Sequence, residues 1–163
     1  MGVAFLVGKE LIRADVENVR EPGMKSEDTV RKAGDVVRRW ITLYRPTIIA
    51  IEEPYFAQSR RSGGLRRVTA AIVRLAAHKM LTVRRYPPTT VRRFVCRDGR
   101  PTRLAVARVI ATDHFPWLHR FYEKEAKKSW WRKRYWTSMF DAIAVGLACL
   151  GHTKPSTPSP PVA

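Results

Sequence analysis

Short apolar runs along the chain predict four β-strands. Residues 2–7 are mostly apolar, and residues 10–19 alternate loosely between apolar and polar positions. Residues 47–51 form an unbroken run rich in β-branched residues, which is typical of a strand buried on both faces of a sheet. Residues 81–86 form the fourth run, which a pair of prolines closes.

Longer stretches with apolar residues at helical spacing predict helices between and after these strands. The first helix is expected to begin at Ser26 as its N-cap and to end before a proline at position 46. The last, residues 137–150, is apolar nearly all round, which is typical of a buried helix. The others are expected at residues 68–80, 90–96 and 101–112. This order of elements predicts an α/β fold in which helices flank a mixed sheet.

The length of the chain suits a single domain with one hydrophobic core. It has 163 residues, of which 45% are apolar. Residues 1–152 are expected to form this domain. Residues 153–163 are rich in proline, serine and threonine, and we expect them to be a disordered tail.

The net charge is strongly positive and indicates a polyanionic partner. The chain has 31 lysines and arginines against 14 acidic residues, a formal net charge of +17. Such an excess favours nucleic acid, because neutralising phosphates releases counterions. The basic residues are interleaved with apolar ones, which favours a folded basic surface over a disordered arm. Ribosomal RNA or an anionic membrane surface would satisfy the charge equally well, so charge alone predicts no chemistry.

Cysteine usage and hydropathy favour a cytoplasmic protein. Cys96 and Cys149 show neither metal-ligand spacing nor a disulfide framework, so we expect them to be core thiols. The amino end lacks the pattern of a signal peptide. The longest apolar run, residues 139–150, is too short to span a bilayer and contains Asp141.

Acidic residues directly follow the predicted buried strand at residues 47–51. Glu52 and Glu53 come first, and Pro54 then ends the strand. Ligands and catalytic groups in open α/β sheets tend to lie at the carboxyl ends of strands, which makes Glu52 a candidate site residue. The alternative is that both acids are solvated loop residues.

A second acid, Asp141, lies inside the apolar helix at residues 137–150. Burying a carboxylate that has no partner costs on the order of several kcal/mol, so Asp141 is expected to have one. The partner could be one of the many arginines. The sharper hypothesis is that Asp141 and Glu52 converge on a divalent cation, for which their hard oxygens suit Mg²⁺ or Mn²⁺.

Three sequence segments, in their order and spacing, resemble a known family. They are Ile-Ala-Ile-Glu at residues 49–52 with Tyr55 and Ala57 after it, Tyr86-Pro87-Pro88 with Val91 and then Gly99 to Arg103, and Asp-Ala-Ile-Ala at residues 141–144. Over residues 2–150 the chain is similar to the RuvC Holliday-junction resolvases of the ribonuclease H-like nuclease superfamily.

This resemblance implies a ribonuclease H-like fold and a metal-dependent endodeoxyribonuclease acting on branched DNA in recombination and repair. Glu52 and Asp141 would be ligands of Mg²⁺ (or Mn²⁺). Arg103 falls where the family has an active-site lysine and would stabilise the charged reacting phosphate. A homodimer is expected from the family alone, because two strands must be cut symmetrically.

Basic and aromatic residues after Glu52 are expected to contact the nucleic acid. Tyr55 would supply a stacking face beside a phosphate groove. The groove would be lined by Arg60, Arg61, Arg66 and Arg67, with Arg92 and Arg93 on the short helix after the last strand. The alternative for the first group is a solvated, arginine-rich helix start.

Two departures from the family pattern leave other functions open. Ser138 stands where the family has a further acid, and a hydroxyl is a poor substitute for a carboxylate on Mg²⁺. The family also opens with a central strand carrying Asp-x-Gly, before the strand that residues 2–6 resemble. We therefore expect the encoding frame to continue upstream of Met1 with such a strand, and the 163-residue form to be inactive alone. The alternatives are a non-catalytic nucleic-acid-binding protein that has lost the metal site, and a basic protein bound to ribosomal RNA.

Overall fold

The computed structural model describes residues 1–53, 62–97, 101–128 and 135–152. Its strands are β1 (Gly2–Val7), β2 (Glu10–Val16), β3 (Ile48–Glu52) and β4 (Thr82–Tyr86). Its helices are α1 (Ser26–Tyr44), α2 (Ser62–His78), α3 (Pro88–Cys96), α4 (Arg103–Val109), α5 (His119–Ala126) and α6 (Thr137–His152). A π-helical turn (Ile110–His114) and a 3-10 turn (Pro116–Leu118) join α4 to α5.

The predicted elements are present, with differences at several ends. Ser26 is the first helical residue of α1, so its prediction as the N-cap is wrong. Lys25 holds that position and makes no side-chain capping bond. Arg45 then ends α1 in the left-handed conformation, with φ of 47°, directly before a proline. The helix expected at residues 101–112 begins only at Arg103, because the Thr102 hydroxyl caps it by accepting from the Ala105 N–H at 3.1 Å.

The strands form two separate pairs within the described residues. β1 and β2 are antiparallel, whereas β3 and β4 are parallel. The α/β class and the mixture of strand directions agree with the prediction, but β1 and β3 are not joined in one continuous sheet.

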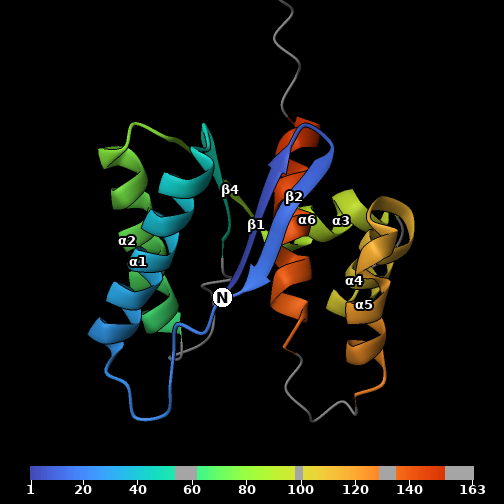
Figure 1. Cartoon of the computed structure of the whole chain (residues 1–163), viewed down its shortest axis with the longest axis horizontal. Coiled ribbons are helices and arrows are strands. Elements are labelled where there is room, and N and C mark those ends of the chain that lie inside the picture. The colour runs from blue at the N-terminus through green and yellow to red at the C-terminus, as the bar shows by residue number, and fades with distance from the viewer. Residues whose placement is uncertain (54–61, 98–100, 129–134, 153–163) are drawn as a thin grey trace, which may run out of the picture.

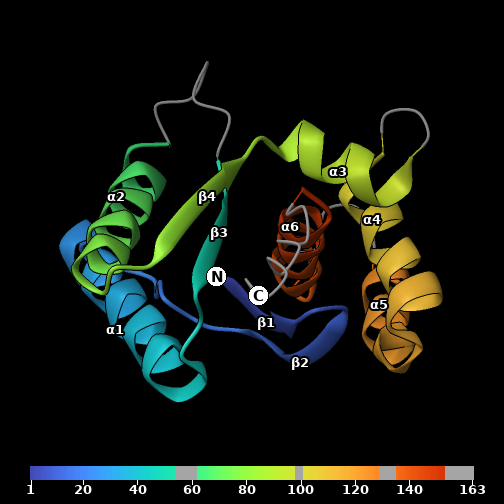
Figure 2. The same cartoon turned by 90° about the horizontal axis from the view of Figure 1, so that it is seen from above.

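Helices cover both faces of the strands (Figures 1 and 2). α1 and α2 lie on one side, where their apolar faces form a core cluster with part of β3. α6 lies on the other side and packs with α3 and α4 in a second core cluster. Cys149 of α6 is buried, and Cys96 packs half-buried against this second cluster, which agrees with the prediction of core thiols.

Two glycines let β1 lie close along α6. A Cβ added to Gly2 would come within 1.7 Å of the Ser138 carbonyl oxygen. One added to Gly146 would come within 2.6 Å of a methyl carbon of Leu6. The start of β1 therefore lies at the start of α6, and both elements run in the same direction.

Candidate active site

Glu52 lies at the carboxyl end of β3, as the sequence predicts. Its side chain is half-buried. Burial raises the pKa of the Glu52 carboxyl, and the negative charge of Asp141 raises it further, while Arg103 and Arg92 lower it. Asp141, Arg103 and Arg92 are therefore the charged groups near Glu52.

Asp141 is in the first turns of α6, on the side of the helix that faces the strands. Its side chain is only 15% exposed and forms an ion pair and hydrogen bond with the Arg103 guanidinium. The expectation that a buried carboxylate needs a partner is met here by an arginine, which was the alternative to a metal ion. This hydrogen bond in turn raises the pKa of Arg103.

Arg103 and Arg92 approach the two acids from neighbouring helices. Arg103 is the first residue of α4, and Arg92 is in α3. The side chain of Arg103 is 50% exposed, so it reaches both Asp141 and solvent. The sequence interpretation assigned Arg92 to nucleic-acid contact and had no signal that it lies beside Glu52.

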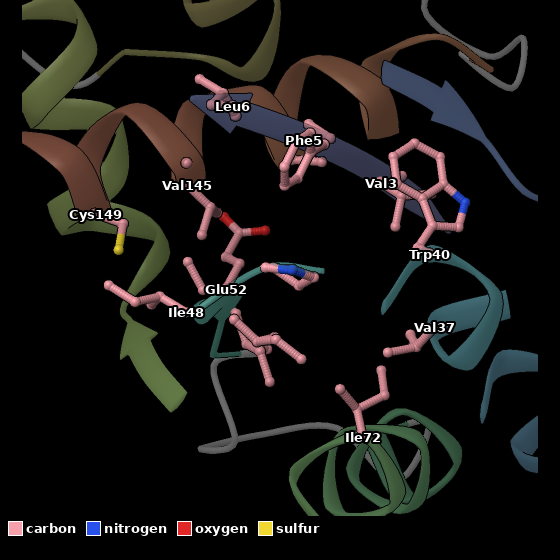
Figure 3. Close-up of a pocket in the computed structure, with 18 of the residues that line it drawn as sticks. Val3, Phe5, Leu6, Val37, Trp40, Ile48, Glu52, Ile72, Val145 and Cys149 are labelled. Carbon is pink, nitrogen blue, oxygen red and sulfur yellow. The ribbon is translucent and has the colours of Figure 1, made fainter. Parts of the chain in front are cut away.

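A cavity of about 690 Å³ connects the site to the space between the two strand pairs. Glu52, Asp141, Arg103 and Ser138 all line it. In Figure 3, Glu52 points from β3 toward Val145 on α6, with Phe5 of β1 nearby. The structure thus brings together the three residues predicted to be catalytic, from three elements that are far apart in sequence.

The site contains carboxylate ligands suited to a divalent cation, but only a small number of them. Carboxylate oxygens suit Mg²⁺ or Mn²⁺. Among the described residues, however, no three acidic, histidine or cysteine side chains gather as a metal-binding group. Ser138 lines the same cavity and offers only a hydroxyl, and Arg103 already forms an ion pair with Asp141.

The residues predicted to bind nucleic acid divide into two groups. Arg66 and Arg67 are exposed on α2, and Arg93 is exposed on α3. Tyr55, Arg60 and Arg61 lie outside the described residues.

Comparison with solved structures defines the fold of the chain. The structure of Thermus thermophilus RuvC superposes with a TM-score of 0.64 at 20% sequence identity, covering 90% of this chain and 83% of that one. RuvC of the same organism in complex with a Holliday junction substrate gives a TM-score of 0.63 at 18% identity, covering 90% and 82%. The fold is therefore ribonuclease H-like, which confirms the predicted fold class.

Sequence comparison narrows this class to one family. The family model described as crossover junction endodeoxyribonuclease RuvC matches residues 1–112, more than half of the chain. The chain belongs to the RuvC family. That match includes Glu52 and Arg103, whereas Asp141 lies beyond it.

A curated relative is the crossover junction endodeoxyribonuclease RuvC of Mycolicibacterium vanbaalenii. It is 28% identical over 105 residues, which are 63% of this chain and 54% of the relative. The chain thus spans about half the length of this relative. Within the described residues, no helix is both long and apolar enough to cross a membrane.

Proposed function

We propose that this protein is a RuvC-type endodeoxyribonuclease that acts on branched DNA and works as a homodimer. The observation that carries the proposal is the convergence of Glu52, Asp141 and Arg103, in a member of the RuvC family, at the carboxyl end of β3. A homodimer would give the two matched sites that symmetric cleavage of a four-way junction requires.

Glu52 and Asp141 would hold Mg²⁺ or Mn²⁺, which when bound supplies an activated water and charge for the leaving oxygen. For Asp141 to serve as a ligand, Arg103 has to release it. Its half-exposed guanidinium can then turn toward a DNA phosphate and stabilise the negative charge that develops there. Arg103 would therefore pair with Asp141 in the free protein and with a DNA phosphate in the complex.

The DNA would lie against the basic residues around this site. Arg66, Arg67 and Arg93 are exposed and would bind phosphates, with Arg92 closest to the acids. Tyr55, Arg60 and Arg61 directly follow β3 in sequence, and we assign them to the same contact.

Cleavage of a synthetic four-way DNA junction tests the proposal. The assay uses the chain as it is and the chain extended ahead of Met1 by an apolar strand that ends in Asp-x-Gly. We expect both to bind and the extended chain to cut with Mg²⁺ or Mn²⁺. Glu52→Gln and Asp141→Asn in the extended chain should bind but not cut.

A second function, nucleic-acid binding without catalysis, is favoured by a specific observation. Asp141 is already paired with Arg103, and a serine stands at position 138 where a further acid would be needed. If the extended chain binds junctions but never cuts them with either ion, the binding function replaces the nuclease.

A further inference from the structure

Glu125 on α5 is a buried acid that the candidate active site does not include. Among the described residues it is the one charged side chain that is fully buried. Its oxygen Oε1 accepts hydrogen bonds from the Lys128 ammonium at 2.8 Å and from the backbone N–H of Trp136 at 2.9 Å. Its other oxygen, Oε2, is buried and has no hydrogen-bond partner in the described part of the chain.

Stability alone does not account for a carboxylate at this position. A buried ion pair can often be replaced by apolar side chains of similar size without loss of stability, because burying the charges costs free energy. Glu125 adds to that cost by leaving Oε2 unsatisfied, while its partner Lys128 is 29% exposed and reaches the surface. The hydrogen bond from Trp136 indicates what else the carboxylate does.

This hydrogen bond places the carboxylate of Glu125 at the start of α6. Trp136 directly precedes α6, and its carbonyl accepts from the N–H groups of Met139 at 3.0 Å and Phe140 at 3.2 Å, which begins the helix. The helix dipole favours a negative charge at this end. Glu125 therefore holds the first turn of α6 through a directional hydrogen bond as well as through its charge.

The ring of Trp136 is held by the same face of α5. Phe121, one helical turn before Glu125, packs on this ring with centroids 4.5 Å apart. Helix α5 itself packs against α4 and lies beside it in Figures 1 and 2. Glu125 and Phe121 thus connect the pair formed by α4 and α5 to the start of α6.

The start of α6 is the part of this helix that belongs to the candidate active site. Asp141 is five residues after Trp136, about 7.5 Å along the helix at a rise of 1.5 Å per residue. Its partner Arg103 is the first residue of α4. Helices α4 and α6 also pack directly through apolar side chains, but such contacts are non-directional. The hydrogen bond to Glu125 therefore determines how far α6 extends along its own axis beside α4.

We propose that Glu125 is a positioning residue, which fixes the first turns of α6 relative to α4 and so holds Asp141 opposite Arg103. The hydrogen bond from the Trp136 N–H carries this role, and Lys128 compensates the buried charge. The placement of Asp141 follows from these contacts alone, whereas its effect on DNA cleavage rests on the proposed function.

Exchange of the Arg103 guanidinium protons with water, measured by NMR on the 163-residue chain, tests the proposal. Asp141→Asn removes the ion pair and gives the rate for an unpaired Arg103. Glu125→Met has a side chain of similar length that cannot accept the Trp136 N–H. We expect it to speed exchange by about twofold or more, where complete loss of a half-exposed ion pair gives up to about fivefold. A lower global stability would leave this rate unchanged as long as the protein stays folded, because exposed side-chain protons exchange from the folded state.

Three further variants separate the hydrogen bond from other effects. Glu125→Gln retains an acceptor for the Trp136 N–H and should keep the wild-type rate, and so should Lys128→Met. Glu123→Met is the matched control, since it removes a half-exposed acid from the same helix. If Glu125→Met does not fold, its combination with Lys128→Met, which leaves no unpaired charge, takes its place in the comparison.

Two results would overturn the positioning role. One is a wild-type exchange rate at Arg103 in Glu125→Met. The other is an equal increase in Glu123→Met or in Glu125→Gln, which would show that the effect does not come from the hydrogen bond to Trp136.

Cleavage of the four-way junction by the extended chain gives a second readout. Glu125→Met should lower kcat by about tenfold or more and change KM little, because a catalytic group displaced by about 1 Å loses its productive geometry. An unchanged kcat would overturn the effect on cleavage. If the extended chain with Glu125 intact does not cut, the proposed nuclease function fails, and the exchange rates still decide the role of Glu125.

Discussion

At the scale of single residues, Arg103 is placed to compete with a divalent cation for Asp141. Its guanidinium holds the carboxylate that the proposed ion needs. Arg103→Gln should therefore bind Mn²⁺ more tightly in the absence of DNA, by up to about fivefold, since a half-exposed ion pair contributes up to about 1 kcal/mol. Isothermal titration calorimetry measures this, with Arg93→Gln as the control for charge. No gain over the control would contradict the competition.

The raised pKa of Glu52 makes stability depend on pH. Between the ordinary value of 4.5 and its raised value, the folded protein binds more protons than the unfolded one, so stability falls as pH rises through that window. Glu52→Gln removes this loss, and the variant should have a higher Tm than the wild type at pH 7. The advantage should disappear below pH 4.5, where Glu52 is protonated in both states. An equal advantage at both pH values would point to a packing effect instead.

Both acids of the site could be predicted from the sequence around them. Glu52 follows an apolar run typical of a buried strand, and Asp141 interrupts an apolar helix. Their meeting with Arg103 was inferred through the family resemblance. The ion pair itself was not predictable, because nothing local distinguishes Arg103 among 31 basic residues as the partner of Asp141.

At the scale of elements, the contact between β1 and α6 depends on Gly2. Gly2→Ala would place a Cβ 1.7 Å from the Ser138 backbone, so the strand or the helix must shift, at about 1–3 kcal/mol. Gly146→Ala should cost less, because its near contact at 2.6 Å is the end of the Leu6 side chain. Gly34→Ala in α1 is the matched control. It meets nothing within 4 Å and should gain about 0.5–1 kcal/mol. Urea denaturation measures all three variants, and a loss at Gly2 no larger than at Gly146 would contradict the close packing.

Most elements were predictable because their patterns report how each segment is buried. The β-branched run gave β3, and the all-round apolar stretch gave α6. The division of the strands into two pairs was not predictable in the same way, since the pattern of β3 indicates only that both of its faces are covered. The periodicity of a strand indicates which of its faces are covered. It does not indicate which other strands pair with its two edges.

At the scale of the whole molecule, the net charge of +17 is only partly available to a nucleic acid. Several basic residues of α1 are already paired. Arg31 bonds to Asp28 at 2.9 Å, and Arg38 bonds to Asp35 at 2.7 Å. Arg67 on α2 is exposed, and helix α2 has no acid in its first turn. Charge count alone therefore overstates the number of phosphates that the protein can neutralise.

This difference gives a prediction for the salt dependence of binding to four-way junction DNA. Each phosphate contact adds about −0.9 to the slope of log K against log salt on duplex DNA. Arg67→Ala with Arg93→Ala, which removes two exposed arginines, should therefore make the slope shallower by up to about 1.8. Arg31→Ala with Arg38→Ala removes the same charge from residues that pair with acids, and it should leave the slope nearly unchanged.

Fluorescence anisotropy at several salt concentrations measures these slopes for three ligands of equal length: a four-way junction, linear duplex DNA and structured RNA. We expect the junction to bind tightest at moderate salt, because its crossed arms present phosphates to both copies of a dimer at once. Equal slopes for the two double variants would show that binding follows net charge and not contact with these two exposed arginines. Equal affinity for junction and duplex would contradict junction recognition, and a preference for RNA would favour the ribosomal alternative.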